Sequence, residues 1–218
     1  MRLRQARTEV VAAALELLRS GLVRGTAGNV SVRPGGGELV AMTPTGVDYR
    51  RLDPGGVSVV GLDGRLVEGL APSSELPMHV AVYRARPDVG AVVHTHSVFA
   101  TTLAVLGEEL PGVHYVLAHA GRRVRVAPYA TYGSKALAQG CVDTLGEDGA
   151  VLLANHGLLA VGTDLGSAMV VAEAVEDTAE LYWRARQAGT PVVLADEELD
   201  RVAEAFRGYG QPGKPGVT

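Results

Sequence analysis

The stretch Val89-Gly-Ala-Val-Val-His-Thr-His-Ser-Val-Phe99 carries two histidines at the end of an apolar run. A short apolar run of this kind is typical of a buried β-strand, in which alternate side chains point to the same face of the sheet. His94 and His96 are two positions apart, so both imidazoles are expected on one face. The stretch therefore predicts a buried strand that presents two nitrogen ligands to one metal ion.

A second apolar run, Ala150-Val-Leu-Leu-Ala-Asn-His156, ends on another histidine. Three imidazoles from neighbouring strand ends leave one coordination position open, which is the arrangement of catalytic rather than structural zinc. Glu75 precedes both runs and is a further candidate for the site. These residues predict metal-assisted chemistry on a small molecule, with zinc favoured among the common ions by the three imidazoles.

Glu75 is expected at the N-terminus of a helix that runs to residues 84–86, with Ser74 as its N-cap and Pro77 in the first turn. His79 lies four residues after Glu75 on the same helical face. We expect His79 to pack against the site rather than to bind the metal.

The remaining segments indicate an α/β fold with at least partly antiparallel strands. Asp63-Gly64 lies between two strand-like runs and favours a hairpin turn. Helices are expected over the first 20 residues, over 134–145, over 164–188 between Asp164 and Gly189, and over 196–207. Residues 1–207 are expected to form a single domain, and the Gly- and Pro-rich segment 208–218 a mobile tail able to close over the active site.

Composition excludes several classes of protein. The 218-residue chain has a net charge of −4 and no basic block, so no nucleic-acid partner is expected. It has no run of about 18 apolar residues and no apolar signal core, which predicts a cytoplasmic protein without a membrane partner. Cys141 is the only cysteine, so it is expected to be a small packing residue. Lys135 and Lys214 are the only lysines, and neither lies in a buried segment, which disfavours imine catalysis.

Three turns rich in hydrogen-bond donors indicate a phosphate site. The first, Gly25-Thr-Ala-Gly-Asn-Val-Ser31, offers the side chains of Thr26, Asn29 and Ser31 and includes Gly28. The second is Thr43-Pro-Thr45-Gly46, and the third is Ser73-Ser74 at the expected helix N-terminus, where backbone N–H groups favour an anion. Together they predict a phosphate cradle built largely without lysine.

The motifs GTAGNVSVR, TPTG, SSELPMH, HTH and NHG follow one another over residues 25–157. With HYVLAHAG, APYATYG and GYG further on, this succession resembles the class II aldolase/adducin family over nearly the whole chain. The resemblance implies a three-layer α/β/α fold with a central, mainly antiparallel sheet. It also implies a homotetramer with its active sites at subunit contacts.

The resemblance further implies the roles of individual residues. One zinc per subunit is held by His94, His96 and His156, and Glu75 acts as the acid/base. We further expect Glu75 itself to ligate the zinc when no substrate is present. The implied reaction is the reversible cleavage of L-fuculose 1-phosphate to dihydroxyacetone phosphate and L-lactaldehyde. Tyr115 is expected to reach into the active site of the next subunit as a proton donor, and Tyr209 to help close over the aldehyde half. The residues expected to hold the phosphate are Thr26, Gly28, Asn29, Thr45, Gly46, Ser73 and Ser74.

Other functions are also consistent with some of these motifs. Methylthioribulose-1-phosphate dehydratases and ribulose-5-phosphate 4-epimerases resemble the same metal and phosphate motifs, although the epimerases usually resemble SSD where this chain has Ser73-Ser74-Glu75. A non-catalytic, adducin-like interaction domain would predict broken metal motifs, and here they are intact. Hydrolysis by a zinc-bound hydroxide would leave the three donor-rich turns without a purpose.

Overall fold

The computed structural model describes residues 1–208, and its centre is one eight-stranded sheet. Only the pairing of β8 with β9 is parallel among the strands described in this sheet. The spatial order of the strands is β4 (Leu66–Glu68), β3 (Ser58–Gly61), β2 (Leu39–Met42), β1 (Asn29–Val32), β5 (Ala91–Thr95), β10 (Gly157–Gly162), β9 (Ala150–Leu153) and β8 (Val126–Ala127).

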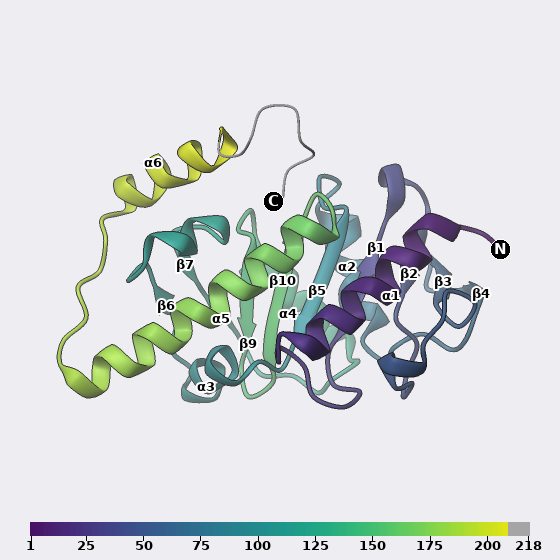
Figure 1. Cartoon of the computed structure of the whole chain (residues 1–218), viewed down its shortest axis with the longest axis horizontal. Helices are drawn as coiled ribbons and strands as arrows, with labels where there is room; N and C mark the ends of the chain where they lie inside the picture. Colours follow the sequence, from purple (N-terminus) through teal and green to yellow (C-terminus); the bar gives the residue numbers. More distant parts are fainter. Residues whose placement is uncertain (209–218) are drawn as a thin grey trace.

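Helices cover both faces of this sheet, so the expected α/β/α arrangement is confirmed (Figure 1). α1 and α5 lie side by side over one face together with α3, while α2 and α4 cover the other (Figure 1). The helices are α1 (Arg4–Arg19), α2 (Leu76–Ala85), α3 (Val98–Leu106), α4 (Lys135–Leu145), α5 (Leu165–Ala188) and α6 (Asp196–Arg207), and the short 3-10 helices are η1 (Pro34–Gly36), η2 (Tyr49–Arg51) and η3 (Tyr115–His119).

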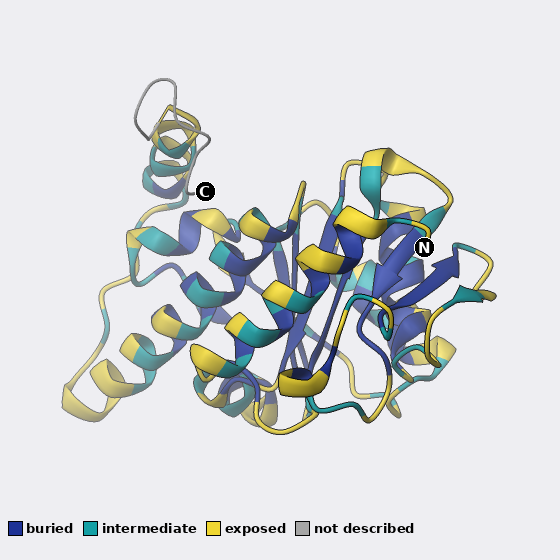
Figure 2. Ribbon diagram, turned by 45° about the vertical axis from the view of Figure 1, so that its right-hand side comes forward, coloured by how far each residue is buried: buried dark blue, intermediate teal, exposed yellow. Residues whose placement is uncertain are grey.

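Side chains alternate along β5, so successive residues pack into the hydrophobic cores on opposite faces of the sheet. Val93 packs into the hydrophobic cluster beneath α1, α3 and α5, and Val92 packs into the cluster beneath α2 and α4. The strands are buried throughout the centre of the sheet, whereas α1 and α5 expose an outer stripe (Figure 2). His94 has the same parity as Val92, so its side chain lies on the face that α2 covers.

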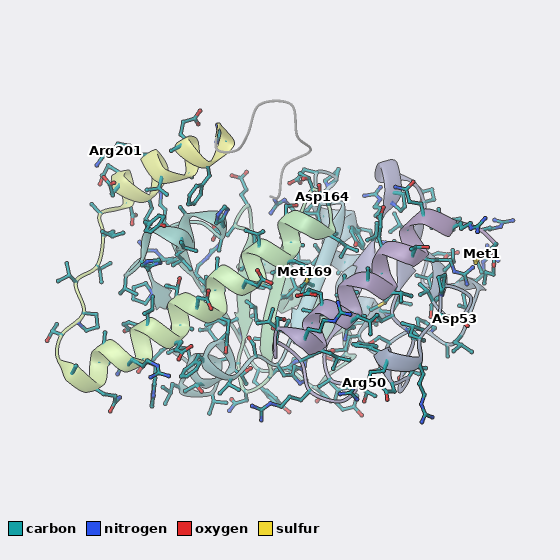
Figure 3. All side chains as sticks on the ribbon, in the orientation of Figure 1. Met1, Arg50, Asp53, Asp164, Met169 and Arg201 are labelled. Atoms are coloured by element: carbon teal, nitrogen blue, oxygen red, sulfur yellow. The ribbon has the colours of Figure 1, made fainter. Side chains whose placement is uncertain are left out.

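Local sequence signals account for several boundaries. β3 and β4 form the antiparallel hairpin expected around Asp63-Gly64. Asp164 lies at the start of α5 (Figure 3). Its side chain caps the helix by accepting a hydrogen bond of 2.8 Å from the N–H of Ser167. α4 and α6 also lie where they were expected, and Cys141 is a fully buried packing residue on α4.

The expected N-cap of α2 is wrong by one residue. Glu75, not Ser74, is the N-cap, and its side chain makes no capping hydrogen bond. Instead, the N–H of Glu75 donates to Oγ of Ser73 over 3.3 Å. The serine oxygen thus takes the capping bond from outside the helix, and the Glu75 carboxylate is left to turn towards the histidines.

α6 stands apart from the layers around the sheet. Leu199 is its only buried residue, and the helix packs mainly on η3. A separate two-stranded pair, β6 (Leu110–Pro111) with β7 (Arg123–Val124), also lies outside the main sheet. No helix in the described part of the chain has an apolar stretch long enough to span a lipid bilayer.

Candidate active site

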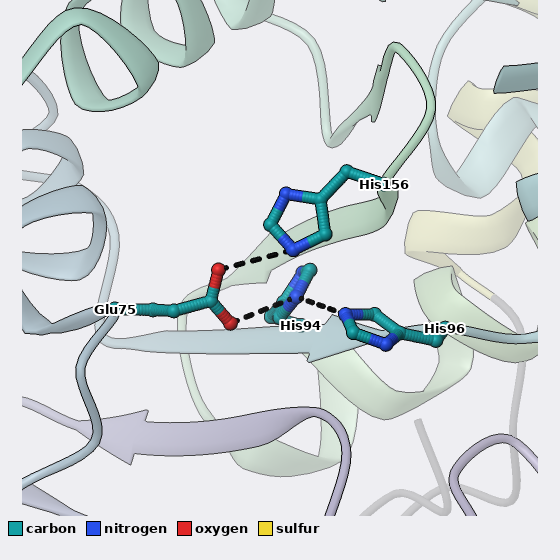
Figure 4. A group of neighbouring side chains, drawn as sticks. All are labelled: Glu75, His94, His96 and His156. Atoms are coloured by element: carbon teal, nitrogen blue, oxygen red, sulfur yellow. Dashed lines mark hydrogen bonds and ion pairs between the residues drawn. The ribbon is translucent and has the colours of Figure 1, made fainter. Parts of the chain in front are cut away.

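Three histidines converge where β5 ends beside the start of β10 (Figure 4). His94 lies in β5, His96 directly follows that strand, and His156 lies in the turn before β10. Nε2 of His94 is 3.0 Å from Nε2 of His96, and the ring of His156 lies 4.9 Å from that of His94 between centroids. The expected meeting of H-x-H with His156 is therefore present in one chain.

Gly157 allows this convergence because β10 approaches β5 closely at this point. A Cβ atom at Gly157 would lie 2.3 Å from the carbonyl oxygen of Thr95 and 3.0 Å from Cδ2 of His96. No real side chain tolerates the first of these distances. A glycine after His156 is thus needed to seat the third imidazole beside the other two.

Glu75 faces the three imidazoles from the start of α2 (Figure 4). Its Oε2 lies 3.0 Å from Nε2 of His94, and its Oε1 lies 3.1 Å from Nε2 of His156. Asn29 donates a hydrogen bond of 2.9 Å from Nδ2 to Oε2. One potential ligand atom from each of Glu75 and the three histidines lies within 4.8 Å of all the others.

The hydrogen bonds around this cluster fit a cation at its centre. Nδ1 of His94 lies 2.8 Å from the carbonyl oxygen of Leu158, which can only accept, so Nδ1 carries the proton. In the neutral imidazole, Nε2 then presents its lone pair to the Glu75 carboxylate. Oε1 of Glu75 is buried and receives no hydrogen bond of proper geometry, in spite of its closeness to His156. Three imidazole nitrogens and one carboxylate are a ligand set for a divalent metal such as zinc.

The charge states of the cluster suit metal binding at neutral pH. Burial raises the pKa of the Glu75 carboxyl, but the positive charge and hydrogen-bond donors that His94 and His156 can offer in place of a metal ion, together with the Asn29 amide, outweigh burial and hold the pKa below its usual range. Burial and the proximity of His94 and His156 lower the pKa of His96 to about 4. The site therefore combines an ionised carboxylate with a His96 imidazole that is neutral and able to ligate.

A cavity of about 440 Å³ opens beside the cluster. Glu75, His96 and His156 line the end of the cavity beside the cluster, and the three donor-rich turns line much of the remaining wall. Neither lysine nor arginine is among the described residues that line it. The cavity brings together all the residues expected to hold the phosphate, namely Thr26, Gly28, Asn29, Thr45, Gly46, Ser73 and Ser74.

The first donor-rich turn, residues 25–31, packs closely against β5 at Gly28. Gly28 has a φ of 77°, and a Cβ atom there would lie 2.7 Å from the carbonyl oxygen of His94 and 2.5 Å from Cγ1 of Val23. The hydroxyl of Tyr49 donates a hydrogen bond of 2.6 Å to the Gly28 carbonyl. The donors of this turn are therefore held at a fixed distance from the histidines.

The second and third turns are joined to each other by backbone hydrogen bonds. The N–H of Ser73 donates to the carbonyl of Thr43 over 3.2 Å, and the N–H of Thr45 donates to the carbonyl of Ala71 over 3.0 Å. Segments some 30 positions apart in the sequence thus form one rigid wall of the cavity.

Sequence reasoning missed four residues that line the cavity, Tyr129, Ala130, Tyr132 and Asn155. Tyr129 and Tyr132 lie in the loop before α4 and are 65% and 69% exposed, so two aromatic rings stand at the mouth. The APYATYG motif that contains them was recognised without a role for any member. The sequence signal that could have suggested a role at the site was the clustering of aromatic residues in this glycine-containing loop.

His79 does not belong to the metal cluster, as expected, but it contacts the site indirectly. Its ring is fully buried, and Nε2 lies 2.6 Å from Oδ1 of Asn29. Burial lowers the pKa of His79 to about 3, with a smaller contribution from His94. His79 is therefore a neutral imidazole that touches a neighbour of Glu75.

Tyr115 is not among the residues that line this cavity within the chain. It lies in η3, is 51% exposed, and faces the ring of Phe206 on α6 with 6.3 Å between centroids. Tyr209, the other tyrosine expected at the site, lies outside the described residues.

Comparison with known proteins identifies the family. Residues 8–183 match the family described as class II aldolase and adducin N-terminal domain. The chain is 44% identical to a 5-deoxy-D-ribulose 1-phosphate aldolase of Bacillus thuringiensis serovar kurstaki, a match that covers 97% of this chain and 100% of that protein. It is 41% identical to the L-fuculose phosphate aldolase of Escherichia coli K12, over 93% of this chain and 94% of that one.

A solved structure of L-fuculose 1-phosphate aldolase has the same fold, with a TM-score of 0.90 and 42% identity over 93% of this chain and 96% of that chain. Enzymes of this class depend on a metal ion, which agrees with the cluster of Glu75 and three histidines. The chain therefore belongs to the class II aldolase and adducin family and is a class II aldolase, a carbon–carbon lyase.

Proposed function

We propose that this aldolase reversibly cleaves a deoxyketose 1-phosphate to dihydroxyacetone phosphate and a short aldehyde, with zinc bound by His94, His96 and His156. The observation that supports this most strongly is Glu75, whose two carboxylate oxygens lie 3.0 and 3.1 Å from Nε2 of His94 and of His156 at the end of a donor-lined cavity. A bound zinc ion supplies Lewis-acid stabilisation of the negative charge that develops on the substrate ketone oxygen.

Residues of the chain bind the phosphate and transfer the protons. The three turns around Asn29, Thr45 and Ser74 bind the phosphate through hydroxyl, amide and backbone N–H groups. In the cleavage direction the C4 hydroxyl gives up its proton to solvent, the bond between C3 and C4 breaks with its electron pair left on the dihydroxyacetone phosphate half, and Glu75, which has taken up a proton from solvent, delivers that proton to C3. In the condensation direction Glu75 removes that proton. An ionised carboxylate with one buried oxygen lacking a hydrogen bond suits this base.

Two substrates are candidates, and they differ only in the aldehyde half. L-fuculose 1-phosphate would give L-lactaldehyde, whereas 5-deoxyribulose 1-phosphate would give acetaldehyde. The relative from E. coli is an L-fuculose phosphate aldolase and the relative from B. thuringiensis is a 5-deoxy-D-ribulose 1-phosphate aldolase, so each supports one candidate. Both share the phosphate, ketone and hydroxyl groups that the cavity would hold.

The aldehyde half is proposed to be completed by a neighbouring subunit in a homotetramer. Tyr115 is half exposed and lies outside the cavity of its own chain, which suits a residue that serves the next active site. There its hydroxyl would donate a proton to the aldehyde oxygen, with Tyr209 helping to close that side.

Two sister reactions are the alternatives. A dehydratase would remove water from the sugar phosphate without breaking the carbon chain, and a 4-epimerase would invert C4. Both would use the same metal and phosphate groups, so product analysis separates them from the aldolase.

The test is release of dihydroxyacetone phosphate from L-fuculose 1-phosphate, 5-deoxyribulose 1-phosphate and L-ribulose 1-phosphate by the purified, metal-analysed protein. We expect release that stops on chelation and returns with zinc. Loss of water or epimerisation without cleavage would contradict the aldolase proposal. The ratio of rates for the three substrates would identify the preferred aldehyde.

A further inference from the structure

A chain of buried hydrogen bonds connects α2 and β1 to the carboxylate of Glu75. The hydroxyl of Tyr83 lies 2.8 Å from Oγ of Ser31, which lies 2.7 Å from Nδ1 of His79. Nε2 of His79 lies 2.6 Å from Oδ1 of Asn29, and Nδ2 of Asn29 lies 2.9 Å from Oε2 of Glu75. The proposed reaction uses only the last of these residues directly as an acid/base.

The two elements present these side chains in register. His79 and Tyr83 are four residues apart on α2 and share one helical face, while Asn29 and Ser31 are two residues apart on β1 and share one face of the strand. The exposed fractions of Asn29, Ser31, His79 and Tyr83 are between 0% and 4%. Since a buried polar group without a partner is costly, each of these groups depends on the next one in the chain.

The chemistry of the end groups gives every bond a direction. An ionised Glu75 carboxylate can only accept, so Asn29 must present Nδ2 to it and Oδ1 to His79. Nε2 of His79 must then carry the proton. In a neutral imidazole this leaves Nδ1 as an acceptor, so Ser31 donates to Nδ1 and accepts from Tyr83.

The opposite direction would disable the site. If Nδ1 of His79 carried the proton, Nε2 would seek a donor and Asn29 would turn its Nδ2 towards His79. Oδ1 of Asn29 would then face the Glu75 carboxylate, placing two acceptors against each other. The Glu75 carboxylate therefore selects the Nε2–H tautomer of His79, and the Ser31 hydroxyl, which can donate as well as accept, satisfies Nδ1 and holds the ring in place.

We propose that His79 is a positioning residue: through Ser31 and Asn29 it fixes Oε2 of Glu75 and leaves Oε1 as the oxygen that exchanges the proton with substrate. This inference rests on the proposed function for the identity of the reaction, but the hydrogen-bond direction can be tested without it. Oε1 is the buried carboxylate oxygen that receives no hydrogen bond within the described chain, which agrees with this division. The second N–H of Asn29 stays available to the cavity, which Asn29 lines.

The first test is ¹⁵N NMR of the zinc-loaded protein labelled at its six histidines, with the His79 signal assigned by its loss in His79→Gln. We expect a neutral His79 that carries its proton on Nε2, unchanged between about pH 5 and pH 9. A proton on Nδ1, or an imidazolium, would overturn the proposal. This readout is independent of substrate, so it stands even if the protein cleaves no ketose phosphate.

The second test compares two substitutions at the same position. Gln at position 79 can still donate to Asn29 and accept from Ser31, whereas Leu can do neither. We expect His79→Leu to lower kcat for cleavage by about tenfold to a hundredfold, the usual range for outer partners of metal sites, with KM and zinc content little changed. His79→Gln should recover most of kcat. Equal losses in both variants, or a loss confined to KM or zinc content, would contradict a positioning role.

Ser31→Ala keeps the proposal testable if His79→Leu does not fold. It removes the donor to Nδ1 of His79 and leaves the imidazole and Asn29 in place. We expect a severalfold loss of kcat, because the imidazole loses the bond that holds it in place, with the Nε2–H tautomer retained in the ¹⁵N spectrum, because Asn29 and the Glu75 carboxylate still require it. Full kcat in this variant would show that Ser31 does not help to position His79, and a switch to the Nδ1–H tautomer would show that the carboxylate does not set the direction. Loss of cleavage with every variant and in the parent protein would instead count against the proposed function.

Discussion

The metal end of the cavity and the region around Tyr115 differ in how much of each a single chain builds. Glu75 and the three histidines converge within 4.8 Å and are supported by buried hydrogen bonds from the same chain. Tyr115, by contrast, is half exposed on η3 and has α6 beside it, a helix with one buried residue. In the proposed reaction, the half that handles dihydroxyacetone phosphate would therefore be preorganised within the subunit, and the aldehyde half would depend on contacts with a neighbouring subunit.

The largest effect is expected from Glu75→Gln. The amide keeps the shape of the side chain but cannot act as a base, so cleavage should fall by about a thousandfold or more. Zinc should stay bound through the three histidines, as measured by metal analysis. Glu109→Gln is the control, because Glu109 is exposed and lies outside the cavity. Near-full activity of Glu75→Gln would show that Glu75 is not the base.

Tyr115→Phe tests the proposed role of the region around Tyr115 in handling the aldehyde. We expect cleavage to fall by roughly tenfold to a hundredfold through loss of a proton donor, with exchange of the dihydroxyacetone phosphate proton nearly unchanged. The melting temperature should not move, because the side chain is 51% exposed. Tyr182→Phe, a partly buried tyrosine away from the cavity, is the matched control. Parallel losses of cleavage and exchange would mean that the two halves are not separable.

Gly28→Ala tests how closely the first donor-rich turn packs against β5. Gly28 and Gly21 both have a φ of 77°, but a Cβ atom would meet other atoms only at Gly28. Gly21→Ala should therefore cost about 1–2 kcal/mol for the left-handed backbone alone. Gly28→Ala should cost roughly 2 kcal/mol more and impair activity, as measured by urea unfolding and by cleavage rate. Equal free energies of unfolding for the two variants would argue against a close approach at Gly28.

The smallest effect concerns the pH dependence of stability. The pKa of His79 is lowered to about 3 in the folded protein from about 6.5 in the unfolded chain. Below about pH 6.5 the unfolded state takes up a proton that the folded state does not, so stability falls as the pH is lowered towards 3. Between pH 6.5 and pH 5 this one group should contribute a loss of about 2 kcal/mol.

Urea unfolding of the metal-free protein at pH 7 and pH 5 measures this contribution when the parent is compared with His79→Gln. The variant should lose less stability than the parent on acidification, because it lacks the titrating ring. The same dependence in both proteins would mean that His79 is not held neutral.

Local patterns were sufficient for much of the fold and for the metal cluster. The apolar run before His94, the hairpin at Asp63-Gly64 and the cap at Asp164 each report on neighbouring residues, and each is present in the structure. H-x-H on a strand needs only the period of two to bring its nitrogens together. The position of His156 followed from the end of its own apolar run.

Other features depend on contacts between distant segments and left no local signal. The bond from His79 to Asn29 requires α2 to lie over β1, a pairing of residues 50 positions apart. Tyr129 and Tyr132 lie in the APYATYG motif, but they come from an irregular loop without periodicity, so the sequence did not predict that they line the cavity. The N-cap of α2 was misplaced because Ser73 accepts the bond from Glu75 and frees the glutamate for the site.

We propose that Glu75 and a metal ion held by three histidines of one chain activate dihydroxyacetone phosphate. The most direct measurement is exchange of its hydroxymethyl proton with deuterium from water, by the native protein, by the chelated protein and by Glu75→Gln. We expect exchange in the native protein alone, and its return when zinc is added to the chelated sample. Exchange that persists after complete metal removal, or in zinc-loaded Glu75→Gln, would contradict the account.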